Sequence, residues 1–117
     1  MTIQRIKPGP RFSSAVIHQG VVYLAGQVAG DPKEDAGGQT RQILATIDRL
    51  LADAGTDKTR ILQATVYLAD MGDYAAMNAV WDAWVVQGKL PTRATVEAKL
   101  AAPQYLVEIV VIAAQAD

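Results

Sequence analysis

The sequence predicts an α+β fold, in which a mixed β-sheet carries two helices on one face. The main observation is the order of hydrophobic patterns along the chain, which reads β-ββ-α-β-α-ββ. A second observation is the length of 117 residues with 50% hydrophobic content, which suits one domain with a sizeable core. We therefore predict a single domain over residues 1–117.

The first half of the chain predicts three strands followed by a helix. Two β-rich runs flank Gln19-Gly20 and form a hairpin, and a short strand before them ends ahead of Pro8-Gly9-Pro10. After a loop rich in Gly, Asp and Pro, apolar residues recur at helical spacing up to Ala54, and Gly55 follows as the residue that ends the helix. The predicted elements are strands over residues 2–6, 15–18 and 21–25 and a helix over residues 40–54.

The second half predicts a strand, a helix and two further strands. Asp73 is predicted to cap this second helix, which ends at Gly88 and Pro91. Alternation in the strands and helical spacing in the helix indicate which side chains face the core. Those side chains are Leu62, Ala64, Val66 and Leu68 in the first strand and Tyr74, Met77, Trp81, Trp84 and Val85 in the helix. The predicted strands lie over residues 60–69, 93–100 and 106–114.

The last strand is apolar on both of its faces. Val107, Ile109 and Val111 share one face, while the other also carries only aliphatic residues apart from Glu108. A strand of this kind is normally buried on both sides, but both helices are already placed on one face of the sheet. We therefore expect the second face to be covered by another copy of the chain in a closed homo-oligomer.

Composition excludes several kinds of site. The chain has no cysteine and one histidine, His18, so no disulfide, no cysteine-based zinc site and no two-histidine metal motif is expected. A net charge of −1 disfavours binding to a nucleic-acid backbone. The N-terminus lacks a signal-peptide pattern, and the longest apolar stretch, residues 105–114, is too short to span a bilayer. The sequence favours a cytoplasmic protein that does not enter a membrane.

Two charged residues and one amide do not fit simple packing. Glu108 stands in the most apolar strand, where it either pairs with a cation or serves as an acid, a base or a water-binding group. Arg93 is predicted to point to the uncovered face, where it either binds a planar carboxylate or forms a salt bridge with Glu108 or Glu97. If the last two strands form a hairpin, Glu108 lies opposite Glu97 or Arg93, depending on the turn. Asn78, on the buried stripe of the second helix, either binds backbone groups or belongs to a site.

Several motifs, in order along nearly the whole chain, resemble the RidA (YjgF, endoribonuclease L-PSP) family of imine/enamine deaminases. The most specific part is the Pro-x-Arg strand at Arg93 followed by the Val-Glu-Ile strand at Glu108. The segments that carry the resemblance are residues 10–16, Leu24-Ala25-Gly26-Gln27, residues 70–78, Pro91-Thr92-Arg93-Ala94-Thr95-Val96-Glu97 and Val107-Glu108-Ile109.

The resemblance implies a chorismate-mutase-like fold, a homotrimer with sites in the clefts between subunits, and no cofactor. It implies hydrolysis of reactive 2-imino and 2-enamino acids to 2-keto acids and ammonia. Arg93 would hold the substrate carboxylate, Glu108 would orient or activate water, and Asn78 would lie near the site. The remaining substrate-binding positions are Phe12, Gly26 and Thr95. Phe12 stands where a tyrosine is usual, Ala25 replaces the serine before Gly26, and Thr95 replaces a frequent cysteine, so this pocket is less polar than is usual.

Two alternatives belong to other functional classes. A non-catalytic binder of small carboxylates or keto acids would use the same Arg93, and the hydroxyls missing at Phe12 and Ala25 favour it. A role as a ribonuclease or translation inhibitor is disfavoured by the net charge and by the absence of a catalytic histidine pair or an aromatic and basic strip.

Overall fold

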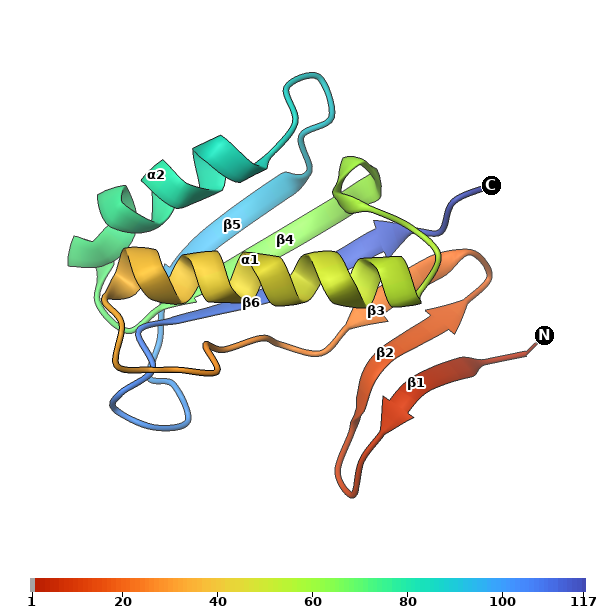
Figure 1. Cartoon of the computed structure of the whole chain (residues 1–117), viewed down its shortest axis with the longest axis horizontal. Helices are drawn as coiled ribbons and strands as arrows, with labels where there is room; N and C mark the ends of the chain where they lie inside the picture. Colours follow the sequence, from red (N-terminus) through yellow and green to blue (C-terminus); the bar gives the residue numbers. More distant parts are fainter. Residues whose placement is uncertain (1) are drawn as a thin grey trace.

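The computed structural model describes residues 2–117, which form one six-stranded sheet and two α-helices (Figure 1). The strands are β1 (Gln4–Pro8), β2 (Ser13–His18), β3 (Val21–Leu24), β4 (Ile61–Leu68), β5 (Thr92–Glu97) and β6 (Val107–Ala114). The helices are α1 (Ala36–Asp53) and α2 (Tyr74–Trp84), and short 3₁₀ turns cover Lys58–Arg60 and Met71–Asp73. The predicted order of elements is confirmed.

The sheet is mixed, with the order β1-β2-β3-β6-β4-β5. β4 and β5 are parallel, and every other neighbouring pair is antiparallel. Both helices lie on one face of the sheet, as predicted, with α1 across its middle and α2 toward the β4–β5 end (Figure 1). Within residues 2–117 no helix lies on the other face, and α2 forms the crossover that joins the parallel strands β4 and β5.

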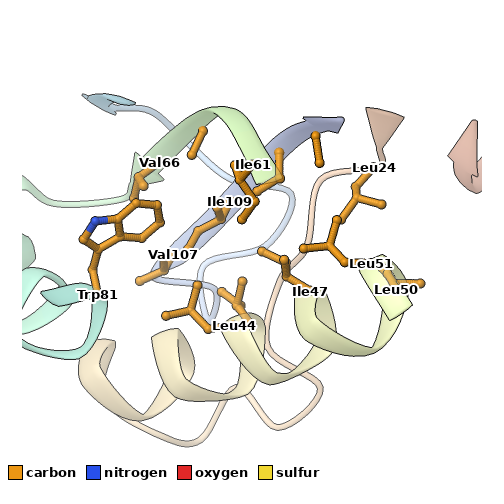
Figure 2. Close-up of a cluster of buried hydrophobic side chains, with 14 of the residues drawn as sticks. Leu24, Leu44, Ile47, Leu50, Leu51, Ile61, Val66, Trp81, Val107 and Ile109 are labelled. Carbon is orange, nitrogen blue, oxygen red and sulfur yellow. The ribbon is translucent and has the colours of Figure 1, made fainter. Parts of the chain in front are cut away.

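The core fills the space between the helices and the sheet. In Figure 2, Leu44 and Ile47 of α1 point toward the central strand β6, which contributes Val107 and Ile109 to the same cluster. Trp81 extends the cluster from α2 and is 6% exposed. Burying side chains of this size stabilises the fold by about 2 kcal/mol each. The packing of both helices against this face of the sheet is therefore strongly favoured. No helix among residues 2–117 is long and apolar enough to cross a membrane.

Several element ends differ from the prediction; α2, for example, ends at Trp84, ahead of the predicted stop at Gly88 and Pro91, and β5 ends at Glu97 and not at residue 100. α1 begins at Ala36, four residues before residue 40, because the side chain of Asp35 accepts a hydrogen bond of 2.9 Å from the backbone N–H of Gly38. Asp73 precedes α2 but makes no capping hydrogen bond. Asp70 instead accepts from Gly72 N at 2.7 Å and starts the 3₁₀ turn that leads into α2. β1 runs through residue 8 rather than ending at residue 6.

A β-bulge in β4 explains why the prediction of Leu62 as a core residue is wrong. The pairing of β4 with β6 shifts between Ile61 and Gln63, which turns Leu62 outward and leaves it 50% exposed. Ile61 takes its place in the core at 5% exposure. Near this end of the sheet, hydrogen bonds from the hydroxyl and backbone N–H of Thr59 lower the pKa of the exposed Asp57 carboxyl.

Candidate functional site

Arg93 lies on the helix-covered face of the sheet, so its predicted orientation toward the uncovered face is wrong. In the parallel pair β4–β5, Arg93 is the partner of Ala64, which is 1% exposed beneath the helices. Partners in register point to the same face. The prediction assumed that the apolar side chains of β5 face the helices, but β5 is an edge strand. Its Val96 lies on the other face and is 43% exposed.

Aromatic and sulfur groups of α2 hold the Arg93 guanidinium. Its Nη1 lies 3.8 Å from Met77 Sδ, and its Nη2 donates to Tyr74 Oη at 3.4 Å. The guanidinium carbon lies 5.1 Å from the ring centre of Trp81 and 5.8 Å from that of Tyr74. Attraction between the cation and these rings stabilises Arg93 by about 1 kcal/mol or more and restricts its direction.

No carboxylate in the described chain neutralises Arg93. The ion pairs among residues 2–117 join Lys7 to Asp53 and Arg60 to Asp117. Glu97 accepts instead from the backbone N–H of Met71 at 3.0 Å. The structural alternative for Arg93, a salt bridge to Glu97 or Glu108, therefore does not occur within one chain. A half-buried guanidinium that has no carboxylate partner in its own chain is suited to bind a planar anion through two parallel hydrogen bonds.

Two further predicted site residues lie on the elements that hold Arg93. Thr95 is the next residue of β5 on the same face, paired with buried Val66, and Asn78 follows Met77 on α2. Asn78 Oδ1 and Thr95 Oγ1 are buried and have no hydrogen-bond partner among residues 2–117. An unsatisfied buried oxygen costs about 1–3 kcal/mol, so packing alone does not explain either oxygen. We call Arg93, Asn78 and Thr95, together with the two rings that contact the guanidinium, Tyr74 and Trp81, the arginine half-site.

Glu108 lies on the opposite face of the sheet from Arg93. It is the register partner of Tyr67, whose partner in turn is Val96 on the uncovered face. The predicted hairpin between the last two strands does not form, because β4 lies between β5 and β6. Neither register expected for Glu108, opposite Glu97 or opposite Arg93, therefore occurs.

Gly26 positions the Glu108 carboxylate. The loop after β3 pairs with β6 through two hydrogen bonds between the backbones of Gln27 and Ile109, at 2.9 and 3.0 Å. This pairing brings Gly26 against Glu108, so that a β-carbon at position 26 would overlap Glu108 Oε2. We call Glu108 and Gly26 the glutamate half-site, and Glu108 borders a surface hollow of about 300 Å³. The hollow is lined by Tyr67, Ala98, Lys99, Leu100, Ala101, Glu108 and Val110.

Phe12, the last predicted site residue, is far from Arg93 within one chain. It lies in the turn between β1 and β2 and is 69% exposed. The β1–β2 hairpin and β5 stand at opposite ends of the sheet (Figure 1). β2 and β5 are four strand positions apart, which corresponds to about 19 Å. One chain therefore brings together neither Phe12 with Arg93 nor Arg93 with Glu108.

Sequence reasoning missed two residues of the arginine half-site. The sequence predicts Tyr74 and Trp81 as core residues, which is confirmed for Trp81 at 6% exposure and wrong for Tyr74 at 42%. Both rings contact the Arg93 guanidinium. Their spacing on α2 contained the signal, since Tyr74 and Trp81 flank Asn78 on the same helical face. Among residues 2–117, no group of three or more acidic or histidine side chains is placed to hold a metal ion.

Comparison with known proteins identifies the family. The family model described as Endoribonuclease L-PSP matches residues 2–115. The chain belongs to the YjgF/RidA family. A RutC family protein of Haemophilus ducreyi is 53% identical over 112 residues, which cover 96% of either chain. RutC family protein YoaB of Escherichia coli is 49% identical over 114 residues, covering 97% of this chain and 99% of its own.

Solved structures of the YjgF/RidA family share the fold described above. A YjgF family member from Neisseria meningitidis has a TM-score of 0.98 and 50% sequence identity, and the match covers 100% of this chain and 98% of that one. The resemblance seen in the sequence is thus confirmed at the level of the family and of the six-stranded α+β fold. The YjgF/RidA family includes enamine and imine deaminases.

Proposed function

We propose that this YjgF/RidA protein hydrolyses 2-imino and 2-enamino acids to 2-keto acids and ammonia. The observation that carries the proposal is Arg93, a half-buried cation that two aromatic rings orient and no carboxylate of residues 2–117 neutralises. A guanidinium in this state suits the carboxylate that all these substrates share. Asn78 and Thr95 add buried oxygens without partners beside it.

The proposal requires an assembly in which copies of the chain complete one another's sites. Arg93 and Glu108 lie on opposite faces of the sheet, and Phe12 lies at the end remote from Arg93. A contact that sets the glutamate half-site and Phe12 of one copy against the arginine half-site of the next repeats around a ring. We propose a homotrimer of this kind, in which each chain is a single domain over residues 1–117.

The uncovered face of the sheet supports such an assembly. It presents aliphatic and aromatic side chains that no helix covers, among them Tyr23 at 45% and Val96 at 43% exposure. Val110 and Ile112 of β6 lie on the same face and are half-buried. Burying apolar area of this kind against another copy favours association by about 25 cal/mol for each Å².

In the proposed mechanism, Arg93 binds the substrate carboxylate and so fixes the imine carbon in place. Water held by Glu108 attacks that carbon, and Glu108 accepts the proton that the water releases. Glu108 passes that proton to the nitrogen, which gives a neutral carbinolamine. The carbinolamine hydroxyl then gives its proton through Glu108 to the nitrogen, the C–N bond breaks, ammonia leaves, and the C–O bond becomes the carbonyl of the keto acid. An enamine first gains a proton on carbon to become the iminium ion, which loses a proton from nitrogen to give the imine. Phe12 would exclude bulk solvent from this cleft.

The test measures decay of 2-aminoacrylate, generated by a pyridoxal-phosphate enzyme, together with the release of pyruvate. We expect Arg93→Ala to lower kcat/KM by about 100-fold or more, because the carboxylate loses its charged partner. Arg93→Lys should retain an intermediate rate, since lysine keeps the charge but not the planar fork. Arg49→Ala, which removes an exposed arginine of α1, is the matched control and should leave the rate unchanged. Turnover by Arg93→Ala at the parental rate would refute the assignment.

The second candidate is a binder of small carboxylates or keto acids without catalysis. The absence of hydroxyls at Phe12 and Ala25 favours it, because fewer polar groups are then available to the reacting atoms. Keto-acid binding that depends on Arg93, without release of ammonia from imine substrates, would support this function over hydrolysis.

A further inference from the structure

The arginine half-site contains a hydroxyl that the proposed mechanism does not use. Tyr74 is the first residue of α2 and, at 42% exposure, its side chain reaches solvent beside Arg93. Its oxygen lies 3.4 Å from Arg93 Nη2, and its ring lies 5.8 Å from the guanidinium carbon. Any ligand that binds this side of the guanidinium therefore meets the phenol as well.

The direction of the hydrogen bond determines what the phenol can offer. Arginine only donates hydrogen bonds, so Tyr74 Oη is the acceptor in its contact with Arg93. The phenol keeps its own proton, and within residues 2–117 Oη makes no second hydrogen bond that would use it. Donation from a cation to Oη polarises the O–H group and makes it a stronger donor. An oxygen ligand at Arg93 is then the natural acceptor.

We propose that Tyr74 is a second carboxylate donor, which binds one oxygen of the substrate or keto-acid carboxylate while Arg93 binds the carboxylate by charge. This inference rests on the proposed function, because it takes the ligand of Arg93 to be a carboxylate. It assigns Tyr74 to ligand binding and to selection for carboxylates over uncharged analogues such as amides. The phenol partly replaces the polarity that the site lacks at Phe12 and Ala25.

The first test compares Tyr74→Phe with the parental protein in its native assembly. Phenylalanine keeps the ring beside Arg93 and removes only the hydroxyl. We expect the Kd for pyruvate, measured by calorimetry or ligand-observed NMR, to rise about three- to tenfold, the usual effect of losing one hydrogen bond to a charged group. The affinity for pyruvamide should change less than twofold, about the scatter of such measurements. Tyr105→Phe, a matched loss of a hydroxyl in the loop before β6, should leave both values unchanged.

A second test distinguishes two roles of the Tyr74 phenol: donating a hydrogen bond to the bound carboxylate, or only accepting one from Arg93. Replacement of the tyrosines by 3-fluorotyrosine makes each phenol a better donor and a poorer acceptor. At about pH 6.5, a direct donor predicts tighter pyruvate binding in the parental protein and no change in Tyr74→Phe. Weaker binding on fluorination would show that Tyr74 acts only by accepting from Arg93 and would overturn the inference.

The two proposals fail in different ways. If Arg93→Ala abolishes pyruvate binding while Tyr74→Phe leaves the Kd unchanged, the carboxylate site stands and the role of Tyr74 is wrong. If neither substitution affects pyruvate binding, the carboxylate site itself is wrong. Thermal unfolding of each variant, compared with that of the parental protein, excludes loss of the fold as the cause of weaker binding.

Discussion

At the scale of single residues, the position of Glu108 depends on a neighbour that has no side chain. Gly26 lies against the Glu108 carboxylate because the loop after β3 pairs with β6 at Gln27 and Ile109. Its backbone is not in the left-handed region, so a substitution there acts through space and not through backbone strain. Gly26 is therefore the most direct means of moving Glu108 without changing its chemistry.

We expect Gly26→Ala to separate catalysis from ligand binding. The added methyl group would overlap Glu108 Oε2 and displace the carboxylate from the position proposed for water activation. The expected result is a fall in kcat of about tenfold or more, with the Kd for pyruvate changed less than about twofold because Arg93 is untouched. Single-turnover kinetics and calorimetry measure the two effects.

Gly30→Ala is the matched control, because nothing lies within 4 Å of a β-carbon built at Gly30. It should leave kcat and Kd at their parental values. A Gly26→Ala protein with unchanged kcat would show that Glu108 does not act in the chemical step from the position seen here.

At the scale of elements, one buried amide of α1, that of Gln39, forms hydrogen bonds with two loops, the one that precedes α1 and the one that precedes β6. Gln39 is 0% exposed and donates to the carbonyl oxygens of Pro32, Glu34 and Gln104 at 3.0–3.1 Å. Its Oε1 accepts from the backbone N–H of Leu106 at 2.9 Å. Leu106 immediately precedes β6, so Gln39 fixes where the strand that carries Glu108 begins.

Gln39→Leu should lower the free energy of unfolding by about 3 kcal/mol, because Leu106 N–H and three carbonyl oxygens all lose the hydrogen bonds that the buried amide makes. Urea denaturation at one fixed protein concentration measures the change. Gln42→Leu is the control, since Gln42 makes two hydrogen bonds with the Asp31 backbone near the surface, at 2.8 and 3.0 Å. Its expected change is below about 1 kcal/mol, because water replaces those partners. Equal changes for the two variants would contradict the importance of burial at Gln39.

At the scale of the whole molecule, the sheet keeps the groups of the proposed site apart. Arg93 is on the helix-covered face of an edge strand, Glu108 is on the uncovered face of a central strand, and Phe12 is at the far end. The separation follows from the strand order, in which β4 lies between β5 and β6. Under the proposed function, activity belongs to the assembly and not to the single chain.

Mixed assemblies of two inactive variants test this arrangement. Arg93→Ala and Glu108→Gln chains, unfolded, mixed in equal amounts and refolded together, should recover about a quarter of the parental activity. In a ring, that fraction of contacts joins an intact Arg93 from one chain to an intact Glu108 from the next. Native mass spectrometry of differently tagged chains confirms that mixing has occurred.

The control for recovery mixes Arg93→Ala with the Arg93→Ala/Glu108→Gln double variant, which supplies no intact Arg93 and should stay inactive. If mixed assemblies of the two single variants form but remain inactive, Arg93 and Glu108 do not meet across the contact between chains. The proposed mechanism would then fail even if each residue is necessary alone.

The class of fold, the order of the elements and the membership of the family could all be predicted before the structure was known. Periodicity shows which face of a strand or helix is apolar, as in β6 and α1, because burial depends on side chains that are regularly spaced along the chain. It also marked Glu108 and Arg93 as residues that packing does not explain. Periodicity did not predict boundaries such as the start of α1, because capping by Asp35 depends on a single local hydrogen bond.

How Arg93 and Glu108 are placed relative to each other could not be predicted, because it depends on the pairing of strands far apart in the sequence. Strand pairing is a long-range property, and no local pattern indicated that β4 would separate β5 from β6. On an edge strand both faces are partly exposed, so alternation in β5 did not tell which face carries Arg93. The contacts of Tyr74 and Trp81 with Arg93 likewise form only because the fold places α2 next to β5. Local residue patterns follow from the sequence because they depend on neighbours in the chain, whereas the site depends on neighbours in space.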